Sequence, residues 1–328
     1  METGPVLKVE DLRTYFFTRT GVVKAVDGVS FDLGAGETLG IVGESGSGKT
    51  ITARSILGLV PKPAGRIVGG RILFKGENLL EKSPAEMREI RGRGICMVMQ
   101  DPMTSLNPVF TVGSQLLESL RMDSNQTAVS LRDKAVSLLT KVSISAPKDR
   151  LGAFPHQLSG GMRQRVVGAI AVSRDPNVLI ADEPTTSLDA TIQLQYLRLL
   201  KEIQAESGTA IIFITHDLGI VARMCDRVAV MYAGKIVELA GVEQLFDNPG
   251  HPYTEALLKS IPDLDLDLDY LPSIKGQPPS LDNLPPGCAF APRCPYAFGK
   301  CAEYPVESLV ESGHITKCWR HYFDNAPS

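Results

Sequence analysis

The sequence GESGSGKT, residues 43–50, matches the phosphate-loop pattern G-x-x-x-x-G-K-[ST]. The apolar residues 37–43 that lead into it predict a buried strand, and residues 51–59 that follow it predict a helix. A glycine-rich turn between a strand and a helix can bind phosphate, because its backbone N–H groups and the helix N-terminus point at the same oxygens. The stretch therefore predicts a nucleotide site.

The residues of this loop have separate expected roles. Gly43, Gly46 and Gly48 allow the backbone to curl around the phosphates. Lys49 is expected to reach the β- and γ-phosphates, and Thr50 is expected to hold Mg²⁺.

Two further apolar runs, NVLIADEP at residues 177–184 and AIIFITHD at residues 210–217, predict buried parallel strands that end in polar residues. Ligands bind at such strand ends in parallel sheets. Asp182 is expected to join the Mg²⁺ shell, and Glu183 is placed to polarise an attacking water. Together with the phosphate loop, this pair predicts a phosphate-loop NTPase.

Composition limits the classes of protein that fit. The 328 residues are 43% hydrophobic and 22% charged, which suits a globular protein with a substantial core. The net charge of −3 lacks the basic surplus typical of nucleic-acid binding. We expect no signal peptide, and no run approaches the ~18–20 apolar residues of a membrane helix. The chain is therefore expected in the cytosol or docked on a membrane by other chains, where its six cysteines stay reduced.

The chain is predicted to have two parts, residues 1–250 and residues 251–328. Three segments of the first part show regular patterns, with strand-like alternation at residues 5–41 and helical spacing at residues 111–120 and 131–144. The second part opens on an amphipathic helix at residues 251–262 and continues through a proline-rich stretch to a cysteine-containing segment. We expect this segment to be a separate small module.

LSGGMRQR, residues 158–165, narrows the prediction from phosphate-loop NTPases in general to one family. This octapeptide resembles the signature sequence of ATP-binding-cassette (ABC) ATPases. The other family motifs stand in their expected order: the Q-loop glutamine Gln100 in MVMQDP, the D-loop residues Ser187, Leu188 and Asp189, and the switch histidine His216. The resemblance covers roughly residues 5–245.

This resemblance implies a fold and a mechanism. The fold would be α/β, a phosphate-loop NTPase of the ABC ATPase type with a RecA-like core, an antiparallel β-subdomain and a helical signature subdomain, followed by a small cysteine-rich C-terminal extension. ATP would lie between the phosphate loop of one chain and the signature residues Ser159, Gly160 and Gly161 of a second chain. Glu183 would act as general base, and His216 would hold the γ-phosphate and the attacking water in register.

The resemblance also assigns contacts to ATP and Mg²⁺. An aromatic side chain is expected to stack on adenine just before the first hairpin, where Tyr15 and Phe16 lie, and Phe16 is favoured. Gln100 would report the occupancy of Mg²⁺ and water to whatever docks nearby. The expected ATP contacts within the chain are Phe16, Gly43, Ser45, Gly46, Ser47, Gly48, Lys49, Thr50 and Gln100. The expected Mg²⁺ contacts are Thr50, Gln100 and Asp182.

Four cysteines gather near the end of the chain. Cys288, Cys294, Cys301 and Cys318 have 5, 6 and 16 residues between them. Four thiolates suit a zinc ion or a [4Fe–4S] cluster, and no pair has the short C-x₂₋₄-C spacing usual in structural zinc sites. The spacing therefore favours the larger cluster, while zinc and unmetallated thiols stay open as alternatives.

HPYT at residues 251–254, followed by prolines and these cysteines, resembles the C-terminal extension of oligopeptide and dipeptide importer ATPases, some of which carry a [4Fe–4S] cluster. The resemblance implies a peripheral subunit at the cytoplasmic face of the cell membrane. Its partners would be a second ATPase chain, often a related but different one, two transmembrane permease subunits and an extracytoplasmic substrate-binding protein, with no nucleic acid. Importers of nickel, glutathione, opines or sugars use the same ATPase subgroup, so the cargo stays open. A soluble ABC ATPase acting on nucleic acid or ribosomes is a distant alternative.

Overall fold

The computed structural model describes residues 4–100, 105–122, 127–186, 188–261 and 273–324. The chain forms two compact units. The first contains Met1–Leu33, Thr38–Glu81 and Phe213–Ser328, and the second contains Gly34–Glu37 and Lys82–Ile212. Helices and strands occur in both units, so the predicted α/β class is confirmed, whereas the division at residue 250 stays a prediction.

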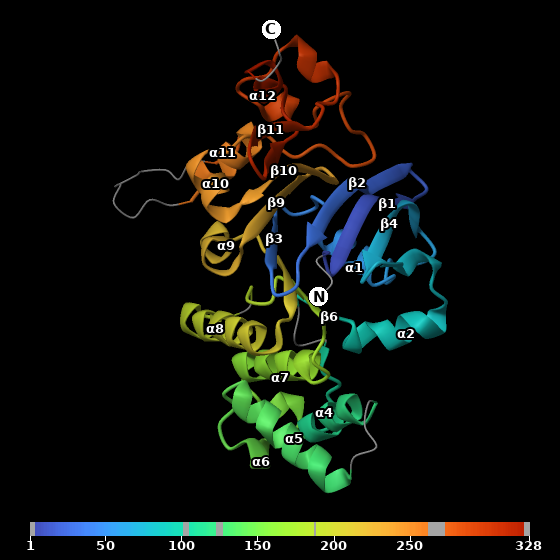
Figure 1. Cartoon of the computed structure of the whole chain (residues 1–328), viewed down its shortest axis with the longest axis vertical. Coiled ribbons are helices and arrows are strands. Elements are labelled where there is room, and N and C mark those ends of the chain that lie inside the picture. Colours follow the sequence, from blue (N-terminus) through green and yellow to red (C-terminus); the bar gives the residue numbers. More distant parts are fainter. Residues whose placement is uncertain (1–3, 101–104, 123–126, 187, 262–272, 325–328) are drawn as a thin grey trace. The chain divides into compact units, whose positions relative to one another are not determined.

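An antiparallel sheet opens the first unit (Figure 1). Its strands are β1 (Leu7–Phe17), β2 (Val22–Leu33), β4 (Gly65–Phe74) and β5 (Glu77–Asn78), in the order β2-β1-β4-β5, and a 3₁₀ turn follows at Leu79–Glu81. Leu7, Val9 and Leu12 of β1 are buried, and the register slips between Val9 and Leu12, where Asp11 has a φ of 45°. The predicted alternation is confirmed, with a bulge that the sequence did not reveal.

A second sheet of the first unit contains the strand that leads into the phosphate loop. Strands β3 (Thr38–Val42) and β9 (Arg227–Tyr232) pair in parallel, and β10 (Lys235–Gly241) runs antiparallel beside β9. Every residue of β3 is buried, as the apolar run predicts. Helix α1 (Lys49–Ile56) follows β3 in the chain, α9 (Leu218–Met224) precedes β9, and α10 (Val242–Asp247) follows β10.

Strand β8 (Ala210–Ile214) passes from the second unit into the first. Within the second unit, the Ala210 amide donates to the carbonyl of Asn177 at 2.9 Å. Within the first unit, the Thr215 amide donates to the carbonyl of Ile41 at 3.3 Å. All residues of β8 are buried, which confirms the predicted buried strand.

The C-terminal segment adds two strands to the edge of the second sheet. Strand β12 (His314–Thr316) pairs antiparallel with β10, and β11 (Ser308–Glu311) pairs antiparallel with β12. The remaining elements of the segment are α11 (Pro252–Lys259), α12 (Trp319–Asp324) and 3₁₀ turns at Ala291–Arg293 and Gly299–Ala302. The sequence gives no signal for this hairpin, because strands of four and three residues show almost no periodicity.

A buried carboxylate, Glu238 on β10, fixes the start of α11. Its side chain is shielded from solvent, and it accepts hydrogen bonds from the amides of Gly250 at 2.6 Å and His251 at 2.9 Å. His314 Nε2 lies 2.7 Å from the same carboxylate.

His251 caps α11, because its Nδ1 accepts the Tyr253 amide at 3.0 Å. Burial lowers the pKa of His251 to about 4, so the neutral ring that can accept this bond is the folded form.

We expect the stability of the protein to fall as the pH drops from about 6.5 toward 4, because unfolded histidine takes up a proton near pH 6.5 and folded His251 does so only near 4. His251→Asn keeps a capping acceptor without the titration. Between pH 7 and pH 4.5 this variant should lose about 2 kcal/mol less free energy of unfolding than the wild type. Urea unfolding at both pH values measures the difference, and equal losses would contradict this role of His251.

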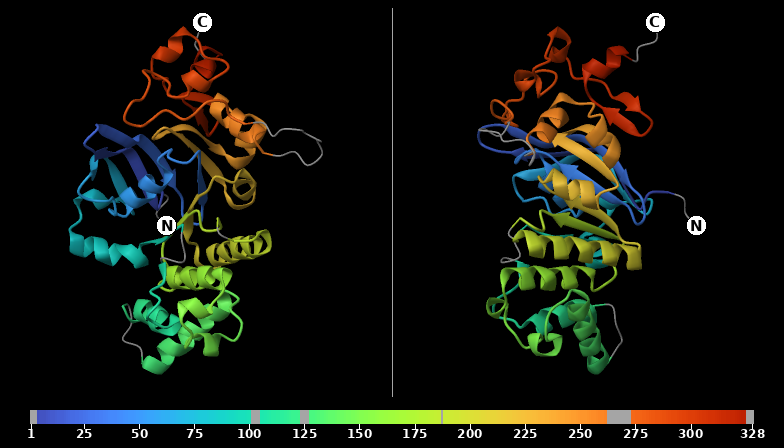
Figure 2. Two further views of the ribbon diagram at one scale, coloured as in Figure 1. Left: turned by 180° about the vertical axis from the view of Figure 1, so that it is seen from behind. Right: turned by 90° about the vertical axis from the view of Figure 1, so that its left-hand side faces the viewer.

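The second unit is mainly helical, and its green helices pack together in both views of Figure 2. Its elements are α2 (Pro84–Arg93), β6 (Ile95–Val98), α4 (Val112–Arg121), α5 (Ala128–Lys141), α6 (Pro147–Arg150), a 3₁₀ turn at Pro155–Gln157, α7 (Gly160–Val172), β7 (Val178–Asp182) and α8 (Ala190–Ser207), with β6 and β7 parallel. Helices α4 and α5 confirm the two helices predicted for this region, and Leu131, Ala135 and Leu139 of α5 are buried as the pattern predicts. In the part of the chain that the structure describes, no helix is both long and apolar enough to cross a bilayer.

Candidate functional site

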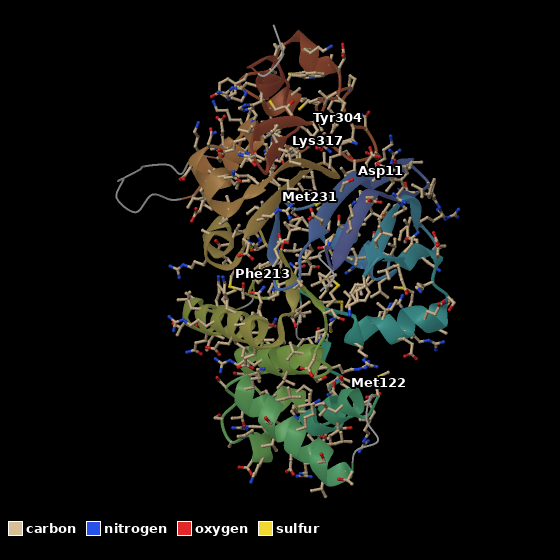
Figure 3. All side chains as sticks on the ribbon, viewed as in Figure 1. Asp11, Met122, Phe213, Met231, Tyr304 and Lys317 are labelled. Carbon is tan, nitrogen blue, oxygen red and sulfur yellow. The ribbon has the colours of Figure 1, made fainter. Side chains whose placement is uncertain are left out.

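The phosphate loop joins β3 to α1 in the predicted strand–turn–helix arrangement. Its backbone leaves no room for side chains at two glycines. A Cβ at Gly43 would overlap the carbonyl oxygen of Met231, a residue of β9 that is labelled in Figure 3. A Cβ at Gly48, which has a φ of 107° and caps α1, would overlap the carbonyl oxygen of Ala25. The neighbouring strands therefore require glycine at both positions.

Lys49 is buried at the base of the loop, where its Nζ donates to the carbonyls of Gly43 at 2.7 Å and Glu44 at 3.0 Å. The hydroxyl of Ser47 is also buried, and among the described residues it has no hydrogen-bond partner. A buried hydroxyl without a hydrogen-bond partner lowers the stability of the fold unless a ligand supplies that partner. The loop thus holds a cation and a polar group ready for an anion, as expected for phosphate oxygens. Ser45 and Gly46 are exposed at the tip of the loop.

The two aromatic candidates for adenine differ in their surroundings. The Tyr15 hydroxyl donates to Asp27 at 2.6 Å, and burial is the main cause that raises the pKa of Tyr15 to about 12. Phe16 is partly exposed and lies opposite Gly65 in the β1–β4 pairing. Because the Tyr15 hydroxyl is engaged elsewhere, Phe16 stays the predicted adenine contact.

In the second unit, β7 ends on Asp182, whose side chain is buried, and Glu183 follows it. Glu183 has a φ of 46°, a left-handed backbone conformation that costs a non-glycine residue on the order of 1–2 kcal/mol. Its carboxylate accepts from Gln100 Nε2 at 3.0 Å and from Thr186 Oγ1 at 3.1 Å. The structure therefore brings together Gln100 and Glu183, two residues to which the sequence assigned separate roles.

The signature residues begin α7. Ser159 is the N-cap of this helix, and its hydroxyl accepts the Met162 amide at 3.3 Å. Gly160 and Gly161 form the first turn, where backbone N–H groups are unmatched within a helix. A Cβ at Gly161 would lie only 2.8 Å from Ile192 on α8, so close packing of the two helices requires glycine there.

The D-loop and the switch histidine also lie at helix starts. Asp189 caps α8 by accepting the Ile192 amide at 3.0 Å, and the Leu188 amide donates to the Thr185 carbonyl at 3.0 Å. Ser187 lies outside the described residues. His216 is exposed in the first unit, between β8 and α9.

The four clustered cysteines line one pocket in the first unit. The pocket wall also carries aromatic side chains, among them Phe290 and Trp319. The Cys288 amide donates to the Cys301 carbonyl at 2.9 Å, which closes the loop between them. Burial raises the pKa of Cys318 to about 11 and also raises the pKa of the Cys288 and Cys294 thiols. Without a bound cation these thiols would stay protonated at neutral pH.

The predicted metal site is not confirmed by this arrangement. Over the described ranges, no group of three or more His, Cys, Asp or Glu side chains is disposed to hold a metal ion. The structure thus places the four cysteines around one pocket.

Sequence reasoning missed one contact of the phosphate loop. Glu44, the variable residue after Gly43, forms an ion pair with Arg293 from the cysteine segment and a hydrogen bond to Tyr253. The partners lie 249 and 209 positions away, so no local pattern reveals them.

Comparison with known proteins gives two family matches. Residues 26–186 match the ABC transporter family, and residues 237–301 match a family described as the oligopeptide/dipeptide transporter C-terminal region. Among curated proteins, the chain is 51% identical to a probable peptide ABC transporter ATP-binding protein, y4tR, of Sinorhizobium fredii, over 98% of this chain and 97% of that protein. It is also 51% identical to the dipeptide transport ATP-binding protein DppD of Bacillus subtilis, over 96% and 94% of the two chains.

Solved structures share the fold of the cassette. The dimeric ATP-binding cassette MJ0796, bound to ADP and Pi in a post-hydrolysis state, has a TM-score of 0.65 at 24% identity and covers 72% of this chain and 98% of its own. CbiO1 from Clostridium perfringens, part of the cbiONQ transporter complex, has a TM-score of 0.64 at 28% identity, with 75% and 92% coverage.

Proposed function

Because the chain belongs to the ATP-binding proteins of the ABC transporter family, we propose that it hydrolyses ATP to drive the import of di- or oligopeptides. The match of residues 237–301 to the oligopeptide/dipeptide transporter C-terminal region is the main support for peptides as the cargo. Two relatives of nearly equal length, each 51% identical, are named for peptide and dipeptide transport and support it. The ATPase activity itself follows from the family and from the intact set of motifs.

The proposed mechanism assigns each residue a task. Lys49 exchanges its bonds to two loop carbonyls for bonds to the β- and γ-phosphates, and the buried Ser47 hydroxyl gains a phosphate partner. Thr50 and Asp182 would hold the Mg²⁺ ion that accompanies ATP and offsets the charge of the phosphates.

Glu183 accepts a proton from the attacking water, and the bond from Gln100 orients its carboxylate before nucleotide arrives. His216 holds the γ-phosphate and the water in register. The N-terminus of α7, with Ser159 at its cap, would contact the γ-phosphate bound by a second chain. ATP would then close the pair of subunits, and hydrolysis would reopen it.

The proposed assembly contains a second ATPase subunit, two permease subunits and an extracytoplasmic binding protein, with this chain at the cytoplasmic face of the membrane. To test the function, the complex is reconstituted in liposomes with its binding protein, and ATP hydrolysis is measured with and without a mixture of di- and tripeptides. We expect the peptides to stimulate hydrolysis several-fold. Stimulation by nickel, glutathione or a sugar, with none by peptides, would contradict the cargo assignment and leave the ATPase assignment intact.

We also propose that the pocket lined by Cys288, Cys294, Cys301 and Cys318 binds a [4Fe–4S] cluster. In a zinc site, Zn–S bonds of about 2.3 Å bring all four sulfurs within about 4 Å of one another. In a cluster, each thiolate binds a different iron, so the sulfurs stand further apart around a larger space. The four cysteines line one pocket, and four thiolates are the ligand set that such a cluster takes, which supports the proposal.

Protein purified without oxygen is expected to contain about four irons and four acid-labile sulfides per chain, with broad visible absorption. Cys294→Ser should lower both contents, whereas Cys225→Ser, at a buried thiol outside the pocket, should not. One zinc per chain without sulfide would overturn the cluster assignment.

A further inference from the structure

The side chain of Arg293, the residue before Cys294, reaches the phosphate loop. Its guanidinium donates to both carboxylate oxygens of Glu44, at 2.7 Å and 3.0 Å. The Arg293 side chain is only 4% exposed, and the Glu44 side chain is 28% exposed. Bidentate arginine–carboxylate pairs, in which both carboxylate oxygens accept a hydrogen bond, are stronger than single hydrogen bonds and fix the orientation of the two groups. Shielding from water strengthens their electrostatic attraction.

Further contacts hold Arg293 in place. Its Nε donates to the carbonyl of Lys275 at 3.0 Å, and one terminal nitrogen donates to the Tyr232 hydroxyl at 3.2 Å. The guanidinium also lies 5.9 Å from the centres of the Tyr232 and Phe290 rings. An arginine side chain keeps its positive charge throughout the physiological pH range, so the contact with the Glu44 carboxylate is an ion pair.

The C-terminal segment also holds the backbone of the same loop residue. The Glu44 amide donates to the Tyr253 hydroxyl at 2.8 Å, and the Tyr253 ring is fully buried. The Glu44 carbonyl accepts the amide of Ser47 at 3.2 Å and the Nζ of Lys49 at 3.0 Å. Glu44 therefore links the C-terminal segment directly to Lys49, the lysine that is proposed to bind the phosphates.

A carboxylate in a phosphate-binding loop creates an electrostatic problem. ATP brings several negative charges to a loop whose other parts attract anions, and an unpaired Glu44 would repel them across a short distance. A neutralising partner removes this repulsion, and a partner that binds both oxygens also fixes where the carboxylate points.

We propose that Arg293 is a positioning residue for ATP, which neutralises Glu44 and, with Tyr253, holds the phosphate loop in its binding conformation. The C-terminal segment is then part of the nucleotide site of the chain and not only an appendage for assembly. This inference requires only that the chain binds ATP, and it holds for any cargo and any occupant of the cysteine pocket.

The test measures the affinity of the full-length protein for MgATP by titration calorimetry. Arg293→Met is expected to raise the Kd about tenfold, because it leaves a carboxylate unpaired beside the phosphates. Adding Glu44→Gln to this variant should restore the Kd to within about threefold of the wild type, since the repelling charge is gone. A loss caused only by weaker folding would not be restored by a second substitution in the loop, so failure of this rescue would overturn the proposal.

Lys300→Met is the matched control. Lys300 stands directly before Cys301 as Arg293 stands before Cys294, and it pairs with Glu303 at 2.6 Å within the same segment. This variant should bind ATP as the wild type does, and a weakening equal to that of Arg293→Met would contradict a specific role for Arg293.

Arg293→Lys covers the case in which the methionine variant does not fold. It keeps the charge and loses the second hydrogen bond, so it should weaken ATP binding by no more than about threefold at low salt. Its melting temperature without nucleotide should stay near that of the wild type. A folded lysine variant that binds ATP tenfold more weakly would contradict charge neutralisation as the cause.

Discussion

Glu183→Gln is expected to bind ATP with nearly wild-type affinity and to hydrolyse it at least about 100-fold more slowly. The amide cannot accept the proton of the attacking water, whereas Lys49, the proposed contact of the β- and γ-phosphates, is untouched. Binding of labelled ATP and release of phosphate measure the two effects separately. The variant should also trap the closed pair of subunits, which gel filtration with ATP would detect.

The local geometry makes this variant a clean test. Gln100 now donates to the Glu183 carboxylate, and a glutamine side chain can still present an oxygen to that donor. Thr186 donates to the same carboxylate oxygen, so the orientation of residue 183 has a second support. Glu118→Gln, at an exposed glutamate of α4 in the same unit, is the control that should hydrolyse ATP normally. Normal turnover by Glu183→Gln would remove Glu183 from the role of base.

Local patterns predicted most of the fold, because the signals that fix a helix or a buried strand lie within a few residues of one another. The fully buried strands β3, β7 and β8 are apolar runs in the sequence, and their positions follow directly. The serine of LSGG, Ser159, caps α7, as expected because a hydroxyl just before a helix can accept a hydrogen bond from its first turn. Such features need no knowledge of distant residues.

What the sequence did not reveal depends on contacts between distant positions. Gln100 and Glu183 are 83 residues apart, and Arg293 is 249 residues from Glu44. Neither pair leaves a periodic pattern. The predicted apolar face of residues 251–262 was also partly wrong, because α11 ends at Lys259 and Ile261 beyond it is 40% exposed. Tyr253, which is fully buried on that face, packs against the rings of Tyr232 and Phe290, 21 and 37 positions away in the sequence.

The phosphate loop itself offers the second large effect. Gly43→Ala is expected to lower the free energy of unfolding by about 3 kcal/mol and to weaken ATP binding at least about 100-fold. The added methyl group would overlap the carbonyl oxygen of Met231, and a backbone atom of a buried strand cannot move aside as a flexible side chain can. The loop must shift instead, and with it the two carbonyls that now hold Lys49.

Gly46→Ala separates this steric effect from simple backbone strain. Gly46 has a φ of 80°, so alanine is disfavoured there by about 1–2 kcal/mol, but among the described residues its Cβ would meet no atom within 4 Å. Alanine at residue 46 should therefore cost less stability than alanine at residue 43 and retain measurable ATP binding. Chemical unfolding and ATP titration of both variants give the comparison. Equal losses in the two would mean that left-handed backbone geometry alone, and not the close approach of β9, dictates glycine in this loop.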